Sequence, residues 1–458
     1  MNYSDFNLAF AVWAPVLMGT LFVFLFGACV GSFLNVLAWR LPTGQSVVTP
    51  PSRCPLCGHR LSWRENLPII GWLILRGRCK GCRAKISIQY PLIELLVACI
   101  FAAAYLAFYG AFDRVPGTIL GDAASPWWHL QGFSRSWPAL FLILLGIGGL
   151  VGMSIIDAKW SIIPPEIPTV VTVIAFAGWL GQGFMPESRQ LRDFVPMPVA
   201  SWTVTFAAIG MLLGLGVSRW LVATGRLRMS FADWQDYVKE GDDGGAYPHA
   251  RREMLAEVYF LLPGIAGAGV ACVVAAAFGF TSSEPVCQPM TLLGGSMLGW
   301  IVGGGLIWAI RIIGTLAFGR EAMGLGDVHL QAAVGAMLGW KVALFAFFVA
   351  VFLALVWALA SRLLGRFVKL IGKEMPLGPH LAAAAILFVV ARGVVVAGVD
   401  AFSLGIAHAG AAAGGPPVPD RSELSNPLRA DQPGTRARRL EREPRFPLAE
   451  LAQPSDRR

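Results

Sequence analysis

Charged side chains are scarce in this sequence. Only 14% of its 458 residues are Asp, Glu, Lys or Arg, whereas hydrophobic residues make up 55%. A soluble domain averages about 25% charged residues. The deficit is concentrated in long apolar runs, and a membrane span needs roughly 20 apolar residues. The composition therefore excludes a soluble globule and indicates a membrane protein of many helices.

Several features of secreted and soluble enzymes are also missing. The first thirteen residues contain no Lys or Arg, whereas a secretory signal peptide begins with positive charge, so we expect the first apolar run to be a retained span. No repeat of fixed period is visible, and no glycine-rich cofactor loop follows a strand, as it would in a soluble methyltransferase. Four of the eight cysteines are scattered, mostly in apolar runs, which is typical of small buried residues and not of a disulfide framework: Cys29, Cys99, Cys272 and Cys287.

The apolar runs predict an all-α, polytopic membrane bundle of about eight to ten spans with a small cytoplasmic zinc-binding loop domain. The predicted spans cover residues 14–37, 92–112, 138–156, 167–184, 201–217, 258–280, 292–310, 342–360 and 377–396. The run 328–340 is short for a span, and the side of the C-terminus depends on whether it crosses. The predicted segments are 1–38 (first span), 39–90 (zinc loop), 91–184 (bundle), 185–290 (insertion with two spans and a charged cytoplasmic block), 291–400 (bundle) and 401–458 (disordered tail).

Basic residues cluster in a few polar loops. Residues 40–90 hold nine Lys or Arg against one acidic residue, Glu65, and the net charge of the chain is +9. Such loops face the cytoplasm, so the charge indicates membrane orientation and we expect no nucleic-acid partner. Alternation of the spans then places Asp157 at the cytoplasmic end of the third span. Four further crossings return Asp327 to the same side.

Four cysteines form two C-x-x-C pairs separated by twenty-one residues: Cys54, Cys57, Cys79 and Cys82. Two such turns brought together offer a tetrahedral sulfur site that suits zinc, with Gly58 and Gly81 expected to allow the turns. Two disulfides or idle thiols are the alternatives, and a reducing cytoplasm disfavours disulfides. Because the protein would fill all four positions, we expect a structural role for the metal.

Two acidic residues stand beside apolar runs, where a charge is costly. Taken singly, each has a plain explanation: Asp157 could pair with Lys159, and Asp327 could cap the helix that follows it. Taken together, two carboxylates on one side of the bundle would share a proton and form an aspartic protease dyad. No Ser or Cys nucleophile with a nearby His is evident, and His329 is the only His close to either motif.

Several short motifs follow one another along the chain. They are Gly-Ser-Phe-Leu-Asn at 31–35 with Arg-Leu-Pro at 40–42, the cysteine quartet, the stretch 86–94, Asp157 with Ile-Pro at 163–164, the G-x-G-D stretch 319–328 and the stretch 374–379. Their order resembles that of the type IV prepilin leader peptidases, multi-pass proteins of the bacterial inner membrane that cut prepilins and N-methylate the new terminus.

The resemblance implies specific roles. Asp157 and Asp327 would be the catalytic pair, cutting after a Gly at the cytoplasmic face, ahead of the hydrophobic helix of a type IV prepilin or type II secretion pseudopilin. The cysteines would bind zinc, and methylation would use S-adenosylmethionine. Glu94 and Asn35 are candidates for that second step by motif position alone. A helix-packing hydrogen bond and a polar contact within the bundle explain them more simply.

Two departures from the family pattern are expected to alter substrate fit or pH response. The family usually shows Ile-Pro-Asp after the first catalytic Asp, whereas here Pro165-Glu166 follows Ile163-Pro164. His329 stands two positions after the second Asp, where the family usually has a Lys. The insertion at 185–290 and the tail have no counterpart in the pattern. Two rival hypotheses remain: a proton-coupled transporter, because membrane carboxylates also relay protons, and an assembly scaffold whose zinc loop binds partners.

Overall fold

The computed structural model describes residues 3–110, 132–185, 198–237, 247–280, 288–364 and 376–391. The chain divides into two compact units, Met1–Val396 and Ala397–Arg458. All described residues belong to the first unit, so the predicted disordered tail lies outside them, as does Cys287.

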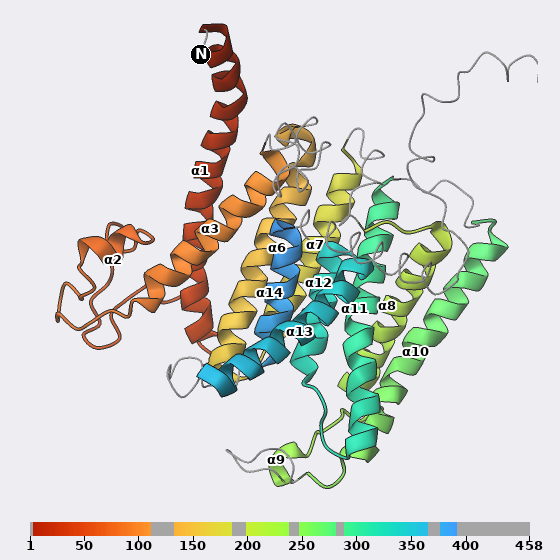
Figure 1. Cartoon of the computed structure of the whole chain (residues 1–458). Coiled ribbons are helices and arrows are strands. Elements are labelled where there is room, and N and C mark those ends of the chain that lie inside the picture. Colours follow the sequence, from red (N-terminus) through yellow and green to blue (C-terminus); the bar gives the residue numbers. More distant parts are fainter. Residues whose placement is uncertain are drawn as a thin grey trace, which may run out of the picture. The chain divides into compact units, whose positions relative to one another are not determined.

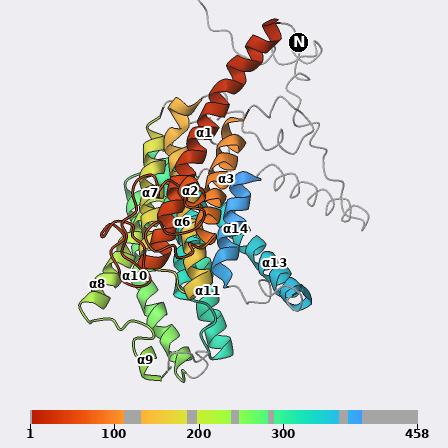
Figure 2. The same ribbon diagram turned by 90° about the vertical axis from the view of Figure 1, so that its left-hand side faces the viewer.

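The described part of the chain is helical and contains no strand, which confirms the all-α prediction. In lipid every backbone N–H and C=O must be satisfied internally, and a helix achieves this within one segment. The helices, shown in Figures 1 and 2, are α1 (Tyr3–Arg40), α2 (Ile70–Ile74), α3 (Gln89–Tyr109), α6 (Phe133–Trp160), α7 (Glu166–Gly183), α8 (Trp202–Ala223), α9 (Trp234–Tyr237), α10 (Ala250–Ala277), α11 (Gln288–Phe318), α12 (Leu325–Leu338), α13 (Trp340–Leu364) and α14 (Leu377–Val390).

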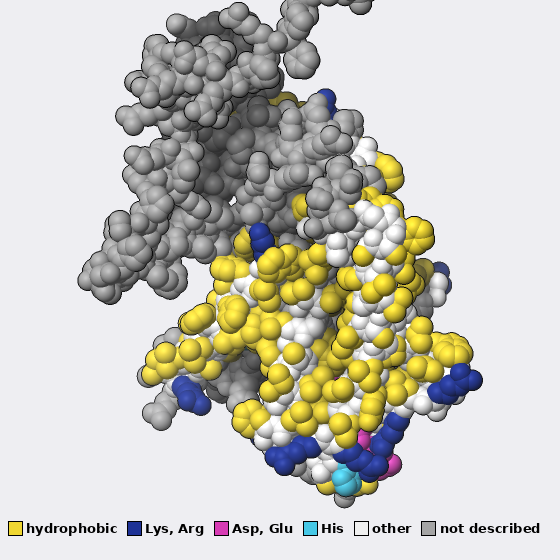
Figure 3. All heavy atoms as spheres, turned by 90° about the vertical axis from the view of Figure 1, so that its right-hand side faces the viewer, with side chains coloured by type: hydrophobic (Ala, Val, Ile, Leu, Met, Phe, Trp, Pro, Cys, Tyr) yellow, Lys and Arg dark blue, Asp and Glu magenta, His cyan; other side chains and the backbone are white. Residues whose placement is uncertain are grey.

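Seven of the described helices are long and apolar enough to cross a membrane: α1, α3, α6, α8, α10, α11 and α13. The remaining predicted spans correspond to α7, with 18 residues, and to α14, with 14. On the face shown in Figure 3, hydrophobic side chains cover the middle of the described surface, and Lys and Arg side chains lie mainly towards its margins. The chain is therefore a multi-pass membrane protein.

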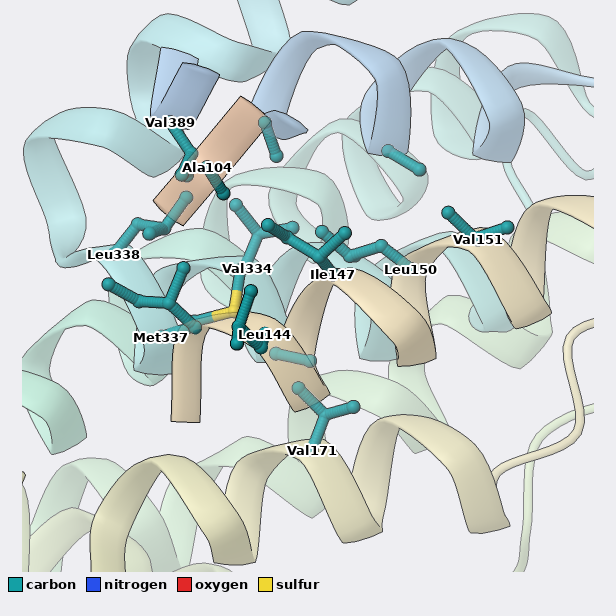
Figure 4. Packing of buried hydrophobic residues seen from close by; sticks show 14 of the residues in the cluster. Ala104, Leu144, Ile147, Leu150, Val151, Val171, Val334, Met337, Leu338 and Val389 are labelled. Carbon is teal, nitrogen blue, oxygen red and sulfur yellow. The ribbon is translucent and has the colours of Figure 1, made fainter. Parts of the chain in front are cut away.

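The short apolar run near residue 330 is the interior helix of the bundle. α12 has 14 residues, so it is about 21 Å long, less than the roughly 30 Å hydrocarbon core. Every residue from Leu330 to Leu338 is buried, and α6, α7, α11, α13 and α14 all contact this helix. Figure 4 shows Val334, Met337 and Leu338 of α12 packed against residues of α6.

Close backbone approach fixes α12 against α11. A side chain at Gly299 would run into the carbonyl oxygen of Gly335, and a side chain at Gly335 would run into that of Gly299. Two side-chain donors reinforce the contact region: Ser296 Oγ donates to the Ala336 carbonyl at 2.6 Å, and Trp179 Nε1 of α7 donates to the Met337 carbonyl at 3.0 Å. The interior helix is thus held in position from two sides.

The segment 185–290, predicted as an insertion, contains the short α9 and two long helices, α8 and α10, at its two predicted spans. They pack against each other, and both contact α11. Figure 1 places them across the bundle from α1 and α3. The polar stretch between them is described only to residue 237 and again from residue 247.

Candidate active site

Asp157 lies in the last turn of α6, and its residue is only 5% exposed. The backbone amide of Gly378, at the start of α14, interacts with its carboxyl group. No donor among the described residues bonds its Oδ2 atom.

Lys159 does not pair with Asp157. Its Nζ atom lies over the ring of Trp39, 4.5 Å from the centroid, and 5.3 Å from the centroid of Trp160. A Lys ammonium is attracted to the face of an indole ring. The explanation of Asp157 as one half of an ion pair with this lysine is therefore wrong.

Asp327 lies in the first turn of α12, which begins after Gly324 without a side-chain cap. The capping explanation of Asp327 is therefore also wrong. Its carboxyl group lies close enough to that of Asp157 for the two charges to interact. The carboxyl group thus lies at the N-terminal end of the interior helix.

Ile163 joins the elements that carry the two carboxyl groups. It lies in the loop after α6, and a side chain at Gly326 would come 2.9 Å from its Cβ atom. A side chain at Gly378 would come 3.3 Å from its Cδ1 atom and would collide with Asp157 Oδ2. The Ile-Pro, G-x-G-D and closing motifs, which are far apart in the sequence, therefore meet around one pair of carboxyl groups.

The two departures from the family pattern lie at helix starts near this site. Glu166 is exposed and opens α7, where its charge suits the helix N-terminus. His329 follows Asp327 by two residues on α12 and is half-buried.

The four cysteines of the quartet form one cluster. Their sulfurs all lie within 4.8 Å of one another, with 3.9 Å between Cys54 and Cys82 and 3.9 Å between Cys57 and Cys79. Zinc bonded to four sulfurs at about 2.3 Å requires sulfurs about 3.8 Å apart, so the cluster fits that ion. None of the seven described cysteines forms a disulfide. The cluster could therefore hold a metal ion, and the disulfide alternative is wrong.

The two knuckles share one backbone pattern. The amide of Gly58 donates to the Cys54 carbonyl, and the amide of Arg83 donates to the Cys79 carbonyl, both at 2.9 Å. Gly58 has φ +70° and Arg83 has φ +59°, so both occupy the left-handed region. The expectation for Gly58 is confirmed, whereas the second turn uses Arg83 in place of Gly81. Gly81 instead packs against the first knuckle, where a side chain would come 3.3 Å from the Cys57 sulfur.

Glu65, the single acidic residue of the basic loop, stabilises the module. Its Oε2 accepts a hydrogen bond from the Ser62 amide at 2.8 Å, and Oε1 lies 3.5 Å from Lys80 Nζ. The Ser62 amide, supported by His59 and Lys80, lowers the pKa of Glu65 to about 2. The carboxylate therefore remains charged at neutral pH and links the first knuckle to the second.

Glu94 and Asn35 make packing contacts. Glu94 Oε2 accepts a hydrogen bond from the Ile69 amide at 2.6 Å, which ties the cysteine module to α3. Ile69 has φ +61°, a strained value for a β-branched residue, and this bond helps to hold it. Asn35 Nδ2 of α1 donates to the Tyr90 carbonyl at 3.2 Å. Both contacts join the first span, the module and the second span.

Sequence reasoning missed a buried polar group beside the site. The span 292–310 was predicted to end before Arg311, but α11 continues through that residue to Phe318. Arg311 is 2% exposed and pairs with Glu257 of α10. A lone charge in an apolar run is costly unless it has a partner. The cost of burying the Arg311 charge indicates that a partner exists, but only the fold identifies that partner as Glu257.

Two family models match the chain. Residues 25–108 match the bacterial peptidase A24 N-terminal domain, and residues 260–359 match the type IV leader peptidase family. The second match includes Asp327, whereas Asp157 lies between the two matched segments.

Several curated relatives share the name prepilin leader peptidase/N-methyltransferase. That of Stutzerimonas stutzeri is 32% identical over 244 residues, which cover 48% of this chain and 71% of the relative. That of Myxococcus xanthus is 51% identical over 105 residues, 23% of this chain and 31% of the relative. That of Aeromonas salmonicida is 24% identical over 387 residues, 79% of this chain and 87% of the relative. The chain thus matches only about a third of the Myxococcus relative. No solved structure matches it significantly.

Proposed function

Because this chain belongs to the type IV leader peptidase family, we propose that it is an aspartic endopeptidase of the bacterial inner membrane. Its substrates are the leader peptides of type IV prepilins or type II secretion pseudopilins, cut at the cytoplasmic face. The observation that carries the proposal is that Gly326, next to Asp327, lies against Ile163, and that Ile163 and Asp157 both lie against Gly378. Asp157 and Asp327 are close enough for their charges to interact. The names of the relatives favour this reading over a transporter or a scaffold.

The chemistry follows from two neighbouring carboxyl groups. Like charges at close range cannot both ionise easily, so the pair holds one proton between its members. The ionised member takes a proton from a water molecule, which attacks the scissile carbonyl carbon. The protonated member donates its proton to the carbonyl oxygen. Collapse of the tetrahedral intermediate returns a proton to the leaving amine and frees the new N-terminus.

A substrate strand needs backbone access to this pair. Gly326 and Gly378 allow Ile163 to pack closely against the starts of α12 and α14, and we propose that the substrate backbone approaches from beside this contact. The hydrophobic helix that follows the cut in a prepilin would lie in the bilayer, where the bundle exposes apolar side chains.

Two cofactors belong to the proposal. Zinc would be held by Cys54, Cys57, Cys79 and Cys82, where it would supply four bonds that fix the module. S-adenosylmethionine would supply the methyl group for a second step on the new N-terminus, as the names of the relatives indicate.

Co-expression of the chain with a type IV prepilin tests both steps. The mass of the purified pilin reports the position of the cut and the addition of a methyl group. We expect Asp157→Asn and Asp327→Asn each to lower cleavage at least about 100-fold, the scale of general acid–base catalysis, while the protein stays folded. Cleavage at the normal rate by either variant would refute the assignment.

A further inference from the structure

A buried arginine connects α10 to the loop before the G-x-G-D motif. Arg311 lies on α11, and its Nε atom donates to Glu257 Oε1 of α10 at 2.9 Å. Its Nη1 atom donates to the Glu321 carboxylate and to the Met323 carbonyl oxygen. One guanidinium therefore contacts α10 on one side and the loop of residues 319–324 on the other.

Glu257 is as buried as its partner, at 3% exposed. Its Oε1 atom also accepts a hydrogen bond from Ser230 Oγ at 3.1 Å, and Oε2 accepts one from Trp308 Nε1 at 2.8 Å. Both oxygens are thus occupied by protein donors. A buried ion pair is retained only with good geometry and satisfied hydrogen bonds, and this pair has both.

The loop is held at three points. Glu321 and Met323 contact Arg311. Between them in the sequence, the Ala322 amide donates a hydrogen bond to Thr315 Oγ1 at 3.1 Å. Met323 directly precedes Gly324, the last residue before α12, and Asp327 lies in the first turn of that helix. The position of the Met323 carbonyl therefore sets where the first turn of α12 starts.

We propose that Glu257 and Arg311 form a brace through which α10 positions Asp327. They are positioning residues, because neither touches the carboxyl pair. The planar guanidinium presents several donors in a fixed fork, which lets one side chain hold a carboxylate on α10 and two groups of the loop together. The inference rests on the proposed function and assigns a role to the N-terminal part of α10.

The brace makes two measurable predictions for the full-length protein in lipid nanodiscs. With a type IV prepilin carrying its leader as the probe, Arg311→Met and Glu257→Gln lower kcat at least tenfold and change KM less than twofold. In the same variants, amide hydrogen exchange of residues 320–326 becomes at least tenfold faster, while exchange in the cysteine module is unchanged. Glu257→Gln keeps the shape of the side chain, so this variant alone tests the brace if the Arg311→Met protein does not fold.

Arg228→Gln is the matched control. Arg228 pairs with Asp233 at 3.1 Å and with Glu253 at 3.5 Å, and these ion pairs involve neither Arg311 nor the loop of residues 319–324. We expect this variant to keep wild-type kcat and wild-type exchange at 320–326.

The outcomes separate the brace from the proposed function. If wild-type protein does not cut the prepilin, the proposed function fails, and hydrogen exchange alone decides the brace. Faster exchange confined to residues 320–326 supports it. Unchanged exchange in the loop, acceleration throughout the bundle, or an equal effect of Arg228→Gln overturns it.

Discussion

Gly378 offers a direct way to move one of the two carboxyl groups proposed to be catalytic without removing it. It is the second residue of α14 and is buried against Asp157. A methyl group at this position would overlap Asp157 Oδ2 and lie 3.2 Å from Asp157 Cγ and 3.3 Å from Ile163 Cδ1. Because the carboxyl group is the movable partner, Gly378→Ala displaces Asp157 and leaves the helices in place.

The size of the effect follows from that overlap. Carbon and oxygen atoms need more than 3 Å of separation, so Oδ2 must retreat by about 1 Å to restore van der Waals contact. A misplacement of about 1 Å in an active site can cost on the order of 100-fold in rate. This corresponds to about 2.7 kcal/mol of activation free energy. We therefore expect kcat for prepilin cleavage to fall about 100-fold in Gly378→Ala.

The assay is cleavage of a prepilin by the purified variant in nanodiscs, with thermal unfolding as the check of folding. Gly181→Ala is the matched control, because a side chain at Gly181 of α7 would meet nothing within 4 Å. That change should leave the rate unaltered and stabilise the helix by roughly 0.5–1 kcal/mol. Wild-type kcat in a folded Gly378→Ala protein would show that the Asp157 carboxyl does not take part in the reaction.

Two further predictions concern regions outside the carboxyl pair. Cys79→Ser should abolish the zinc content of the purified protein, measured by metal analysis, because it removes one of four clustered sulfurs; Cys272→Ser on α10 should leave the zinc content unchanged. The hydrogen bond from the Tyr247 hydroxyl, together with the charge of Arg228, lowers the pKa of Asp233 in the folded protein. The contact therefore stabilises the folded protein above the unfolded pKa of about 4. This stabilisation is lost as the pH falls through the lower pKa of the folded state. Hydrogen exchange of the surrounding loop, corrected for intrinsic rates, should therefore accelerate below about pH 4, and an Asp233→Asn variant should lack this dependence.

The sequence predicts the spans and the cysteine cluster, because each depends on residues that are close together in the chain. A bilayer imposes a length on every apolar helix, so the helices of the described part lie where the apolar runs predicted them. Two C-x-x-C turns need only come together to place four sulfurs within reach of one ion. The segment boundaries, which depend on how units separate in space, remain a prediction.

The sequence does not predict which partner a single polar side chain has in the fold. Lys159 is close to Asp157 in the sequence, yet its ammonium group lies over the rings of Trp39 and Trp160. The predicted span 292–310 ends before Arg311, yet this residue lies inside α11, where Glu257 offsets its charge. Each of these side chains had several possible partners in the sequence, and the packing of helices selected one.

The sequence by itself determined that the chain crosses a membrane, that it carries a sulfur site and that two acidic residues stand at span ends in a family motif. Only the tertiary structure decided that those two carboxyl groups meet, with Ile163 in contact with the elements that carry them. The physical reason is that helix length and apolar pattern depend on neighbouring residues. The approach of Asp157 to Asp327 depends instead on how α6, α12 and α14 pack around a shared core.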